Sequence, residues 1–150
     1  MRVLIQRVSS ANVIVNEKAI GEIDKGLLLF LGISEQDSIE DIEWLIKKVT
    51  QLRIFNDQEQ KMNCSIYDVN GDFLVISQFT LLAKTKKGNR PSYVRAAKPE
   101  IAIPLYEKFI ELLKLSSGLK VESGSFGADM KINLCNDGPV TIWLDSKNKE

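Results

Sequence analysis

The apolar run from Leu27 to Ile33 constrains the fold of this chain more than any other segment. A turn signal, Asp24-Lys25-Gly26, precedes the run, and nearly every position within it is apolar. A strand with one solvent-facing side shows alternating polarity, whereas a continuous apolar run is typical of a strand covered on both faces. We therefore expect residues 27–33 to form a central strand of a sheet.

Further strand signals lie toward the N-terminus. Two pairs of apolar residues alternate with polar neighbours, as in strands with one buried face: Val3 with Ile5, and Val13 with Val15. The triplet Asn16-Glu17-Lys18 is placed where a hairpin turn would return the chain through Ile20 to Ile23.

Turn residues also divide the rest of the chain. Asn70-Gly71 predicts a hairpin with a type I′ turn, because both residues tolerate the positive φ angles of that turn. The segment Phe73 to Leu82 should follow as a strand. Two final strands are predicted at Met130 to Asn136 and Val140 to Leu144, with Asp137-Gly138-Pro139 as the turn between them.

Two segments have helical periodicity. Ser38 and Asp41 have the spacing of a capping box, and apolar residues then recur at helical spacing: Ile39, Ile42, Leu45, Ile46, Val49 and Leu52. Pro99 and Pro104 bracket the start of a second helix, which should end near Gly118. Its apolar stripe consists of Leu105, Phe109, Leu112 and Leu113.

The predicted order is strands, helix, strands, helix, strands, with short connections that favour antiparallel pairing. This order indicates an α+β fold, a compact and mostly antiparallel sheet with two helices, in one domain spanning residues 1–150. The pattern leaves open whether the helices cover an open sheet or the sheet closes into a barrel. Residues 147–150 form a charged tail that we expect to fray.

Composition excludes several classes of function. The chain has no histidine, which excludes Ser-His-Asp and Cys-His catalysis and any zinc site with nitrogen ligands. Its 20 basic and 20 acidic residues give zero net charge, so any preference for a polyanion must be local. Cys64 and Cys135 show no Cys-x-x-Cys spacing and are expected to be small buried apolar groups. We expect neither a metal nor another cofactor.

Nothing in the sequence predicts a membrane partner. The longest apolar run is far shorter than the ~20 residues that a membrane-spanning helix needs. Alternating strand-like residues follow Arg2, where a signal peptide would have a long apolar stretch. A cytoplasmic location is therefore expected.

Two short stretches carry polar groups suited to binding or catalysis. Ser77-Gln78-Phe79-Thr80 ends an apolar strand and would supply hydroxyls and backbone donors, although a plain strand end explains the same residues. Gly138 and Pro139 could present bare carbonyl oxygens at a tip, and Pro permits a cis peptide, although a simple turn needs no function.

Two more stretches extend this set. The segment from Lys84 to Lys98 contains no acid and six basic residues, which are Lys84, Lys86, Lys87, Arg90, Arg95 and Lys98. Such a patch suits phosphate contacts, with Tyr93 adding a stacking surface, and a solvated loop is the alternative. The small residues of Phe126-Gly127-Ala128-Asp129-Met130 would allow close approach of another backbone.

These stretches belong to an ordered set that covers nearly the whole chain. The set comprises Met1-Arg2-Val3, Met62-Asn63, Ser77-Gln78-Phe79-Thr80, Lys87-Gly88-Asn89-Arg90-Pro91-Ser92, Phe126-Gly127-Ala128-Asp129-Met130 and Asn136-Asp137-Gly138-Pro139-Val140-Thr141. Together these segments resemble the D-aminoacyl-tRNA deacylase family. Lys84 departs from that pattern, because many relatives carry an acidic residue there.

The resemblance implies a barrel-like α+β domain and a homodimeric editing enzyme. Such an enzyme hydrolyses the ester between a D-amino acid and the terminal adenosine of tRNA. In this family Gly138 and Pro139, joined by a cis bond, would approach the Ser77–Thr80 pocket of the other subunit. The substrate would also contact Phe126, Ala128 and Met130.

Residue chemistry narrows the mechanism. Thr80 is a poor nucleophile without a neighbouring base, and no lysine can be placed beside it or Ser77 from sequence. We therefore expect the ribose 2′-hydroxyl of the substrate to orient or activate water, with backbone N–H groups near Phe79 and Thr80 stabilising the oxyanion.

Specificity would come from the backbone, because one enzyme must accept many D side chains. If main-chain groups hold the α-amino group and Cα rigidly, the side chain of an L-amino acid would clash with Gly138-Pro139. Glycine has no side chain to clash, so some hydrolysis of glycyl-tRNA is expected. Lys86, Lys87 and Arg90 are the expected tRNA contacts, and no DNA partner is expected.

Two alternatives remain at this point. The first is a non-catalytic dimeric module that binds tRNA or another RNA through the basic loop. The second is a different esterase that uses Thr80 or Ser77 as a true nucleophile.

Overall fold

The computed structural model describes residues 1–150 and contains two α-helices, eight strands and one short 3₁₀ turn. In chain order they are β1 (Arg2–Val15), β2 (Lys18–Ile23), β3 (Gly26–Gly32), α1 (Ile39–Gln51), β4 (Phe55–Asn56), β5 (Met62–Cys64), β6 (Asp72–Ser77), the 3₁₀ turn η1 (Phe79–Leu82), α2 (Pro99–Ser117), β7 (Val121–Ser123) and β8 (Lys131–Asp145). The α+β class is confirmed. Neither α-helix is long and apolar enough to cross a bilayer.

The main sheet is nearly closed. Its strand order is β2-β1-β3-β6-β7, and β8 pairs along β1 from Arg2 to Ile14. The sheet curves until β2 approaches β7, where a Cβ added at Gly21 would lie 3.1 Å from the carbonyl oxygen of Ser123. Because the end strands of the path come this close, the barrel-like alternative is confirmed.

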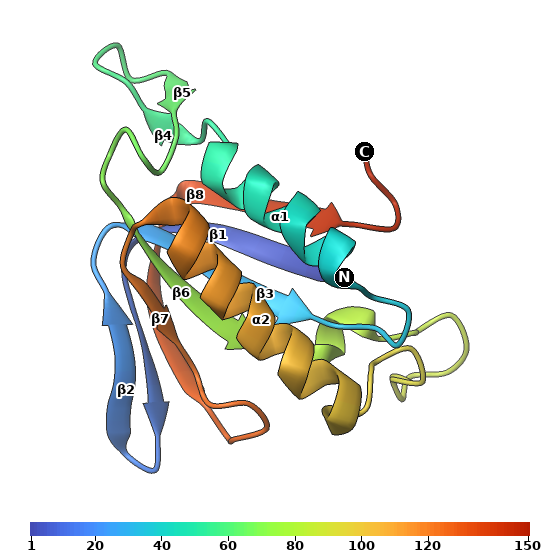
Figure 1. Cartoon of the computed structure of the whole chain (residues 1–150). Helices are drawn as coiled ribbons and strands as arrows, with labels where there is room; N and C mark the ends of the chain where they lie inside the picture. Colours follow the sequence, from blue (N-terminus) through green and yellow to red (C-terminus); the bar gives the residue numbers. More distant parts are fainter.

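Antiparallel and parallel pairings are combined in this sheet. β1 is antiparallel to β2, β3 and β8, whereas β6 is parallel to both β3 and β7. Parallel neighbours need a crossover, which α1 and α2 supply, and Figure 1 shows both helices over one face of the sheet. As a result the carboxyl ends of β3 and β6 meet at one edge.

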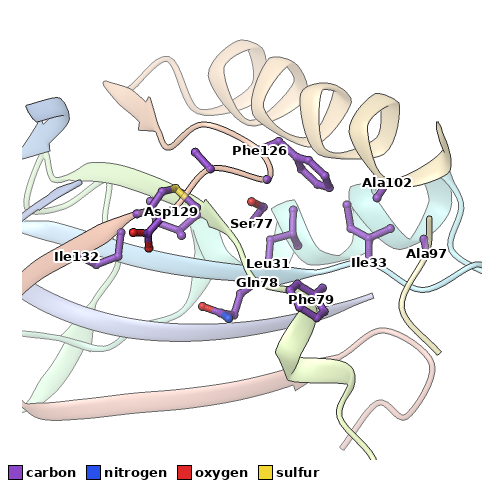
Figure 2. A pocket seen from close by; sticks show the side chains of 14 residues that line it. Leu31, Ile33, Ser77, Gln78, Phe79, Ala97, Ala102, Phe126, Asp129 and Ile132 are labelled. Carbon is purple, nitrogen blue, oxygen red and sulfur yellow. The ribbon is translucent and has the colours of Figure 1, made fainter. Parts of the chain in front are cut away.

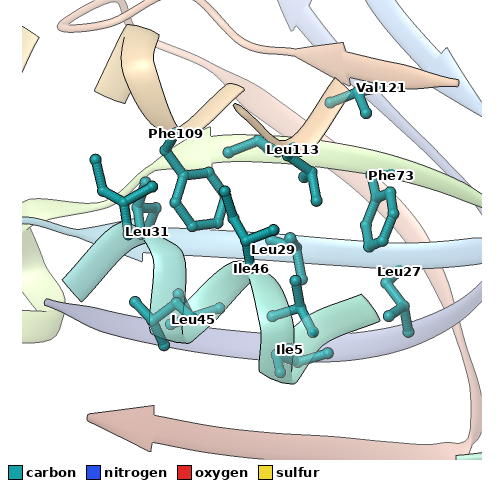
Figure 3. Packing of buried hydrophobic residues seen from close by; sticks show 14 of the residues in the cluster. Ile5, Leu27, Leu29, Leu31, Leu45, Ile46, Phe73, Phe109, Leu113 and Val121 are labelled. Carbon is teal, nitrogen blue, oxygen red and sulfur yellow. The ribbon is translucent and has the colours of Figure 1, made fainter. Parts of the chain in front are cut away.

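The central position predicted for residues 27–33 is confirmed by β3. Leu27, Leu29 and Leu31 pack against the helices in the larger core (Figure 3). Leu28 belongs to a second cluster on the opposite face, together with Leu74. Each fully buried leucine contributes about 1.5–3 kcal/mol relative to an exposed one, so β3 anchors both layers.

Both helices begin where the sequence predicts, and α2 also ends at its predicted glycine. The backbone N–H of Ser38 donates to the Asp41 carboxylate over 2.8 Å, as in a capping box. α2 has Pro99 in its first turn and ends before Gly118, which takes the left-handed conformation at φ 65°. Asn16 and Glu17 also have positive φ, and they form the predicted turn between β1 and β2.

The hairpin predicted at Asn70-Gly71 is wrong. Asn70 has φ 48°, but Gly71 does not have positive φ, and β6 pairs with β3 and β7 in parallel. The chain enters β6 from turns, in which the Gly71 N–H donates to the Ile66 carbonyl over 3.0 Å. The strand also ends at Ser77, because the next residues form η1.

Two other sequence expectations need correction. The segments predicted as two C-terminal strands form one continuous strand, β8, so Gly138 and Pro139 do not reverse the chain. Cys135 is exposed and Cys64 is only half-buried, contrary to the prediction that both are buried. Cys135 lies in β8, which has no buried residue at any position.

Candidate active site

A cavity of about 310 Å³ opens where β3 and β6 end. Its lining comes from these strand ends, η1, the segment leading into α2 with its first turn, and the segment leading into β8 with its first residues: Leu31, Ile33, Ile76, Ser77, Gln78, Phe79, Ala97, Ala102, Phe126, Gly127, Ala128, Asp129, Met130 and Ile132. Ligands in sheets with parallel strands commonly bind beyond the carboxyl ends of those strands. We call this cavity the strand-end pocket.

Six residues singled out in the sequence line the strand-end pocket together: Ser77, Gln78, Phe79, Phe126, Ala128 and Met130. They come from segments about fifty positions apart, and Figure 2 shows Ser77 between Phe126 and Leu31. Thr80 does not line it. The Thr80 hydroxyl instead accepts a hydrogen bond from the Gln78 side-chain amide.

The backbone of Ser77–Thr80 is fixed by its neighbours. The Gln78 N–H donates to the Leu31 carbonyl over 2.7 Å, which extends the contact between β6 and β3 by one residue. The chain then turns into η1, whose first residues are Phe79 and Thr80. The first N–H groups of a helical turn have no partner within that turn, so they can bind an oxyanion.

Tyr106 supports the pocket from α2, and the sequence analysis did not find it. Its hydroxyl donates to the Val75 carbonyl over 2.8 Å, and its ring packs against Phe126 with centroids 5.7 Å apart. Burial raises the pKa of this hydroxyl, so it stays protonated. A tyrosine three residues before Phe109, on the core side of α2, was the available sequence signal.

Gly138 and Pro139 lie in a bulge of β8, outside the strand-end pocket. β8 is in register with β1 at Gln6–Thr141 and at Val8–Asn136, so residues 137–140 bulge opposite Arg7. The Gly138-Pro139 bond is cis, and both residues are exposed. The structure therefore does not bring the two predicted motifs together within the chain.

The Arg7 side chain fixes the position of this bulge through hydrogen bonds. Its guanidinium is buried and donates to the carbonyl oxygens of Asp137 and Ile54 over 3.1 and 2.6 Å. A Cβ added at Gly138, where φ is 124°, would lie 2.9 Å from the Arg7 guanidinium. The sequence analysis missed Arg7, although its alternation with Val3 and Ile5 places a charge on the core face of a strand.

Asn136 is a second support of the bulge. Its side-chain amide donates to the carbonyl oxygens of Arg7 and Val140, both over 3.0 Å. The Thr141 hydroxyl in turn donates to the Asn136 side-chain oxygen over 3.3 Å. Asn136 thus joins the two ends of the bulge to β1.

The basic segment forms an exposed loop beside η1. Lys84 and Ser92 exchange backbone hydrogen bonds of 2.8 and 3.0 Å, which close the loop at its base. Lys86, Lys87 and Arg90 are exposed and form no ion pair. Their positive charge is therefore available to a polyanion.

The lining of the strand-end pocket is mostly apolar. Asp129 is its one ionisable lining residue, and the Asp129 carboxylate is paired with Lys131 at 2.8 Å. Ser77 and Gln78 add a hydroxyl and an amide. Such a site can hold and orient a substrate and stabilise an oxyanion, but it offers no evident side-chain base.

Comparisons with known proteins identify the same family as these sequence motifs. Residues 4–145 match the sequence model of the family described as D-Tyr-tRNA(Tyr) deacylase. Proteins named D-aminoacyl-tRNA deacylase from Flavobacterium johnsoniae and from Bacteroides fragilis are 58% and 59% identical to this chain. In both comparisons, 100% of each chain is covered.

Solved structures show the same fold. A protein named c-Myc DNA unwinding element binding protein superposes with a TM-score of 0.91 at 37% identity, covering 97% of this chain and 98% of the other. A probable eukaryotic D-amino acid tRNA deacylase superposes with a TM-score of 0.82 at 19% identity, covering 95% and 97%. The chain belongs to the D-Tyr-tRNA(Tyr) deacylase family and is a hydrolase that cleaves the ester bond of D-aminoacyl-tRNA.

Proposed function

We propose that this deacylase acts as a homodimer in which Gly138 and Pro139 of one subunit enter the strand-end pocket of the other. The observation that carries the proposal is the position of the bulge. It is exposed, fixed by Arg7 and Asn136, and outside the pocket of its own subunit. A motif held this firmly at the surface is suited to completing a neighbouring site.

The exposed surface of β8 is suited to contact with a second copy of this chain. No residue of this 15-residue strand is buried, and Leu134 and Trp143 are exposed by 37% and 46%. A long strand with exposed apolar side chains is a typical interface, because the partner removes those side chains from water. A second copy would cover β8 and deliver the bulge at the same time.

In this proposal the side chains position the ester, and the substrate assists its own hydrolysis. The ribose 2′-hydroxyl orients or activates water, and the N–H groups near Phe79 and Thr80 stabilise the oxyanion. The absence of histidine supports this role for the substrate. The Thr80 hydroxyl accepts a hydrogen bond from the Gln78 side-chain amide, and Thr80 does not line the pocket. Both observations argue against Thr80 as the nucleophile.

Chirality would be read by the backbone of the entering bulge. Gly138 and Pro139 grip the α-amino group and Cα of a D-amino acid, and an L side chain then meets the same backbone. Glycine has no side chain to clash, so glycyl-tRNA is a weaker substrate. Ser77, Phe126, Ala128 and Met130 hold the rest of the aminoacyl-adenosine, and Lys86, Lys87 and Arg90 bind tRNA phosphates in the cytoplasm.

Nucleic-acid binding through the basic loop, separate from hydrolysis, is a second candidate activity of this hydrolase. The exposed basic loop favours it, as does the structural relative named for binding a DNA element. Incubation with D-tyrosyl-tRNA and L-tyrosyl-tRNA separates the two functions. The deacylase should release D-tyrosine only, whereas a binding module should release neither amino acid.

Mixed dimers test the crossing of subunits directly. Ala128→Trp fills the pocket and leaves the bulge intact, whereas Gly138→Val distorts the bulge and leaves the pocket intact. Each variant alone should be inactive. Refolding them together should restore activity, because one pocket in each mixed dimer meets an intact bulge. Persistent inactivity of mixed dimers, with their formation verified by native mass spectrometry, would contradict the crossed arrangement.

A further inference from the structure

A second cavity, of about 410 Å³, lies next to the strand-end pocket and has a different character. Its lining is mostly polar and consists of Met1, Arg2, Ser34, Glu35, Gln36, Leu82, Val94, Arg95, Asp145 and Lys147. We call it the N-terminal cavity, after Met1 and Arg2.

The two cavities lie on either side of one wall. Three segments of the chain contribute to both cavities, with neighbouring residues in the strand-end pocket and in the N-terminal cavity: Ile33 and Ser34, Phe79 and Leu82, and Ala97 and Arg95. The Ala97 N–H donates to the Ile33 carbonyl over 2.9 Å, which fixes two of these segments to each other. A chain molecule bound in one cavity can therefore extend over the wall into the other.

Tyr93 links the linings of the two cavities, because it contacts Phe79 of the strand-end pocket and precedes Val94 of the N-terminal cavity. Phe79 and Tyr93 meet edge to face with centroids 4.9 Å apart, and they are exposed by 56% and 37%. Val94 follows with 72% exposure. Aromatic side chains exposed beside basic residues are typical of surfaces that bind single-stranded nucleic acid, because each base has a π face.

Charge distinguishes the two possible exits from the strand-end pocket. On the side of the Phe126–Met130 segment, the rim carries Asp129 paired with Lys131 at 2.8 Å, so it offers no free positive charge. On the side of η1, the rim leads to the loop of residues 84–98, which carries six basic residues and no acid. Figure 1 shows this loop, in yellow-green and olive, between η1 and the start of α2. An RNA backbone would leave the pocket on the basic side.

Within the N-terminal cavity, Arg95 is the cation available to a phosphate. Arg2 is paired with Asp145 at 2.9 Å, and Lys147 is paired with Asp41 at 2.7 Å. Arg95 is exposed and forms no ion pair. The remaining lining includes an acid and an amide, Glu35 and Gln36, which suit the amino and carbonyl groups of a base edge.

We propose that the N-terminal cavity binds the nucleotide that precedes the terminal adenosine of the substrate. Its base packs against Val94 in the cavity and stacks on the neighbouring Tyr93, which lies just outside the cavity lining, and Arg95 contacts the phosphate between the two nucleotides. This inference rests on the proposed function, since it takes the strand-end pocket as the site of the aminoacyl-adenosine. It assigns a separate subsite, whose contribution can be measured separately.

Short substrates isolate the contribution of this subsite. D-tyrosyl esters of adenosine, of 5′-AMP and of the dinucleotide CpA add first the phosphate and then the second nucleotide. We expect kcat/KM to rise at least tenfold from the adenosine ester to the CpA ester, because one charged contact and one stacked base are gained. Equal kcat/KM values for the adenosine and CpA esters would overturn the proposal.

Three variants assign the gain to residues, with the ratio of kcat/KM between the CpA and adenosine esters as the readout. Arg95→Gln should lower this ratio about tenfold, with the loss appearing at the step that adds the phosphate. Tyr93→Ala should remove the gain at the step that adds the second nucleotide, and Tyr93→Phe should retain it. The matched control is Lys18→Gln, an exposed lysine at the start of β2, which should leave the ratio unchanged. A ratio unaffected by Arg95→Gln and Tyr93→Ala would overturn the proposal.

Failure of this inference differs from failure of the proposed function. If the adenosine ester is hydrolysed but CpA gives no advantage, the subsite is wrong and the active site stands. If no ester is hydrolysed, the proposed function is wrong, and direct titration of CpA still tests the subsite. CpA should bind about tenfold more weakly to Arg95→Gln than to the unchanged protein, and equal affinities would overturn the subsite.

Discussion

The buried guanidinium of Arg7 donates to the carbonyl oxygen of Asp137 over 3.1 Å, immediately before Gly138. The same side chain donates to the Ile54 carbonyl over 2.6 Å, so it joins the bulge of β8 to the segment that leads into β4. Arg7→Lys should therefore lower kcat/KM for D-tyrosyl-tRNA about tenfold or more, because a lysine cannot make both fork contacts.

The control for this prediction is Arg53→Lys. Arg53 also donates to a backbone carbonyl, that of Asn63 over 2.7 Å, but its contact is exposed and lies in the β4–β5 hairpin. Deacylation by Arg53→Lys should match that of the unchanged protein. If both substitutions lower kcat/KM equally, the Arg7 contact has no special part in the site.

Removal of the Thr80 hydroxyl should have little effect on turnover. Thr80→Ala and Ser77→Ala should keep kcat for D-tyrosyl-tRNA within a few-fold, whereas a substrate with a 2′-deoxy terminal adenosine should not be hydrolysed. The measurement is single-turnover deacylation with both substrates. The reverse pattern would identify Thr80 or Ser77 as the nucleophile.

Glycyl-tRNA should be hydrolysed, although more slowly than D-tyrosyl-tRNA. The steric account requires this, because glycine lacks the side chain that would meet Gly138 and Pro139. Release of glycine should be measured over a series of enzyme concentrations, with L-alanyl-tRNA as the resistant control. If glycyl-tRNA is not hydrolysed even at the highest enzyme concentration, the steric explanation of chiral selection is wrong.

Binding of tRNA should weaken as salt rises. Lys86, Lys87 and Arg90 are exposed and unpaired, so each phosphate contact that they make adds about 0.7–0.9 to the slope of log affinity against log salt. Replacing all three by Gln should reduce the magnitude of that slope by about 2–3, with Lys18→Gln as a control that leaves it unchanged. An identical slope in the triple variant would remove the basic loop from the tRNA interface.

Stability should fall at acid pH through Asp41. Burial raises the pKa of this carboxyl, but hydrogen bonds from Lys147, Ser146 and Ser38 outweigh burial and lower the pKa to about 2. Because the folded pKa lies below the ordinary value of 3.8, Asp41 stabilises the fold above about pH 4, and that contribution is lost as pH falls toward 2. Asp41→Asn should flatten the free energy of unfolding between pH 4 and pH 2, whereas Asp24→Asn should not.

Local signals predicted the helices and the central strand well. The capping box at Ser38, the glycine at Gly118 and the continuous apolar run of β3 each correspond to an observed element. The hairpin at Asn70-Gly71 failed because the pairing of β6 is decided by the α1 crossover, which lies outside any local window. The sequence could not show that β8 is continuous, because β1 pairs on both sides of the bulge and holds it in one strand.

The residues of the candidate site were likewise predicted only in part. Motifs supplied Ser77 to Phe79 and Phe126 to Met130, and the fold brings them to one pocket. Arg7 and Tyr106 were missed because their roles depend on backbone carbonyls that are distant in sequence, Asp137 and Val75. A charge or hydroxyl on the core side of an element is the signal that would have found them.

One strand carries both parts of the proposed dimeric site. β8 starts beside Met130 in the wall of its own pocket and continues, through Ile132, to the bulge that would serve the partner. A change in the twist of β8 would therefore disturb donor and acceptor roles at once. In such a dimer each active site takes its selecting backbone from the other subunit, so the stereochemical fidelity of one pocket depends on the bulge of its twin.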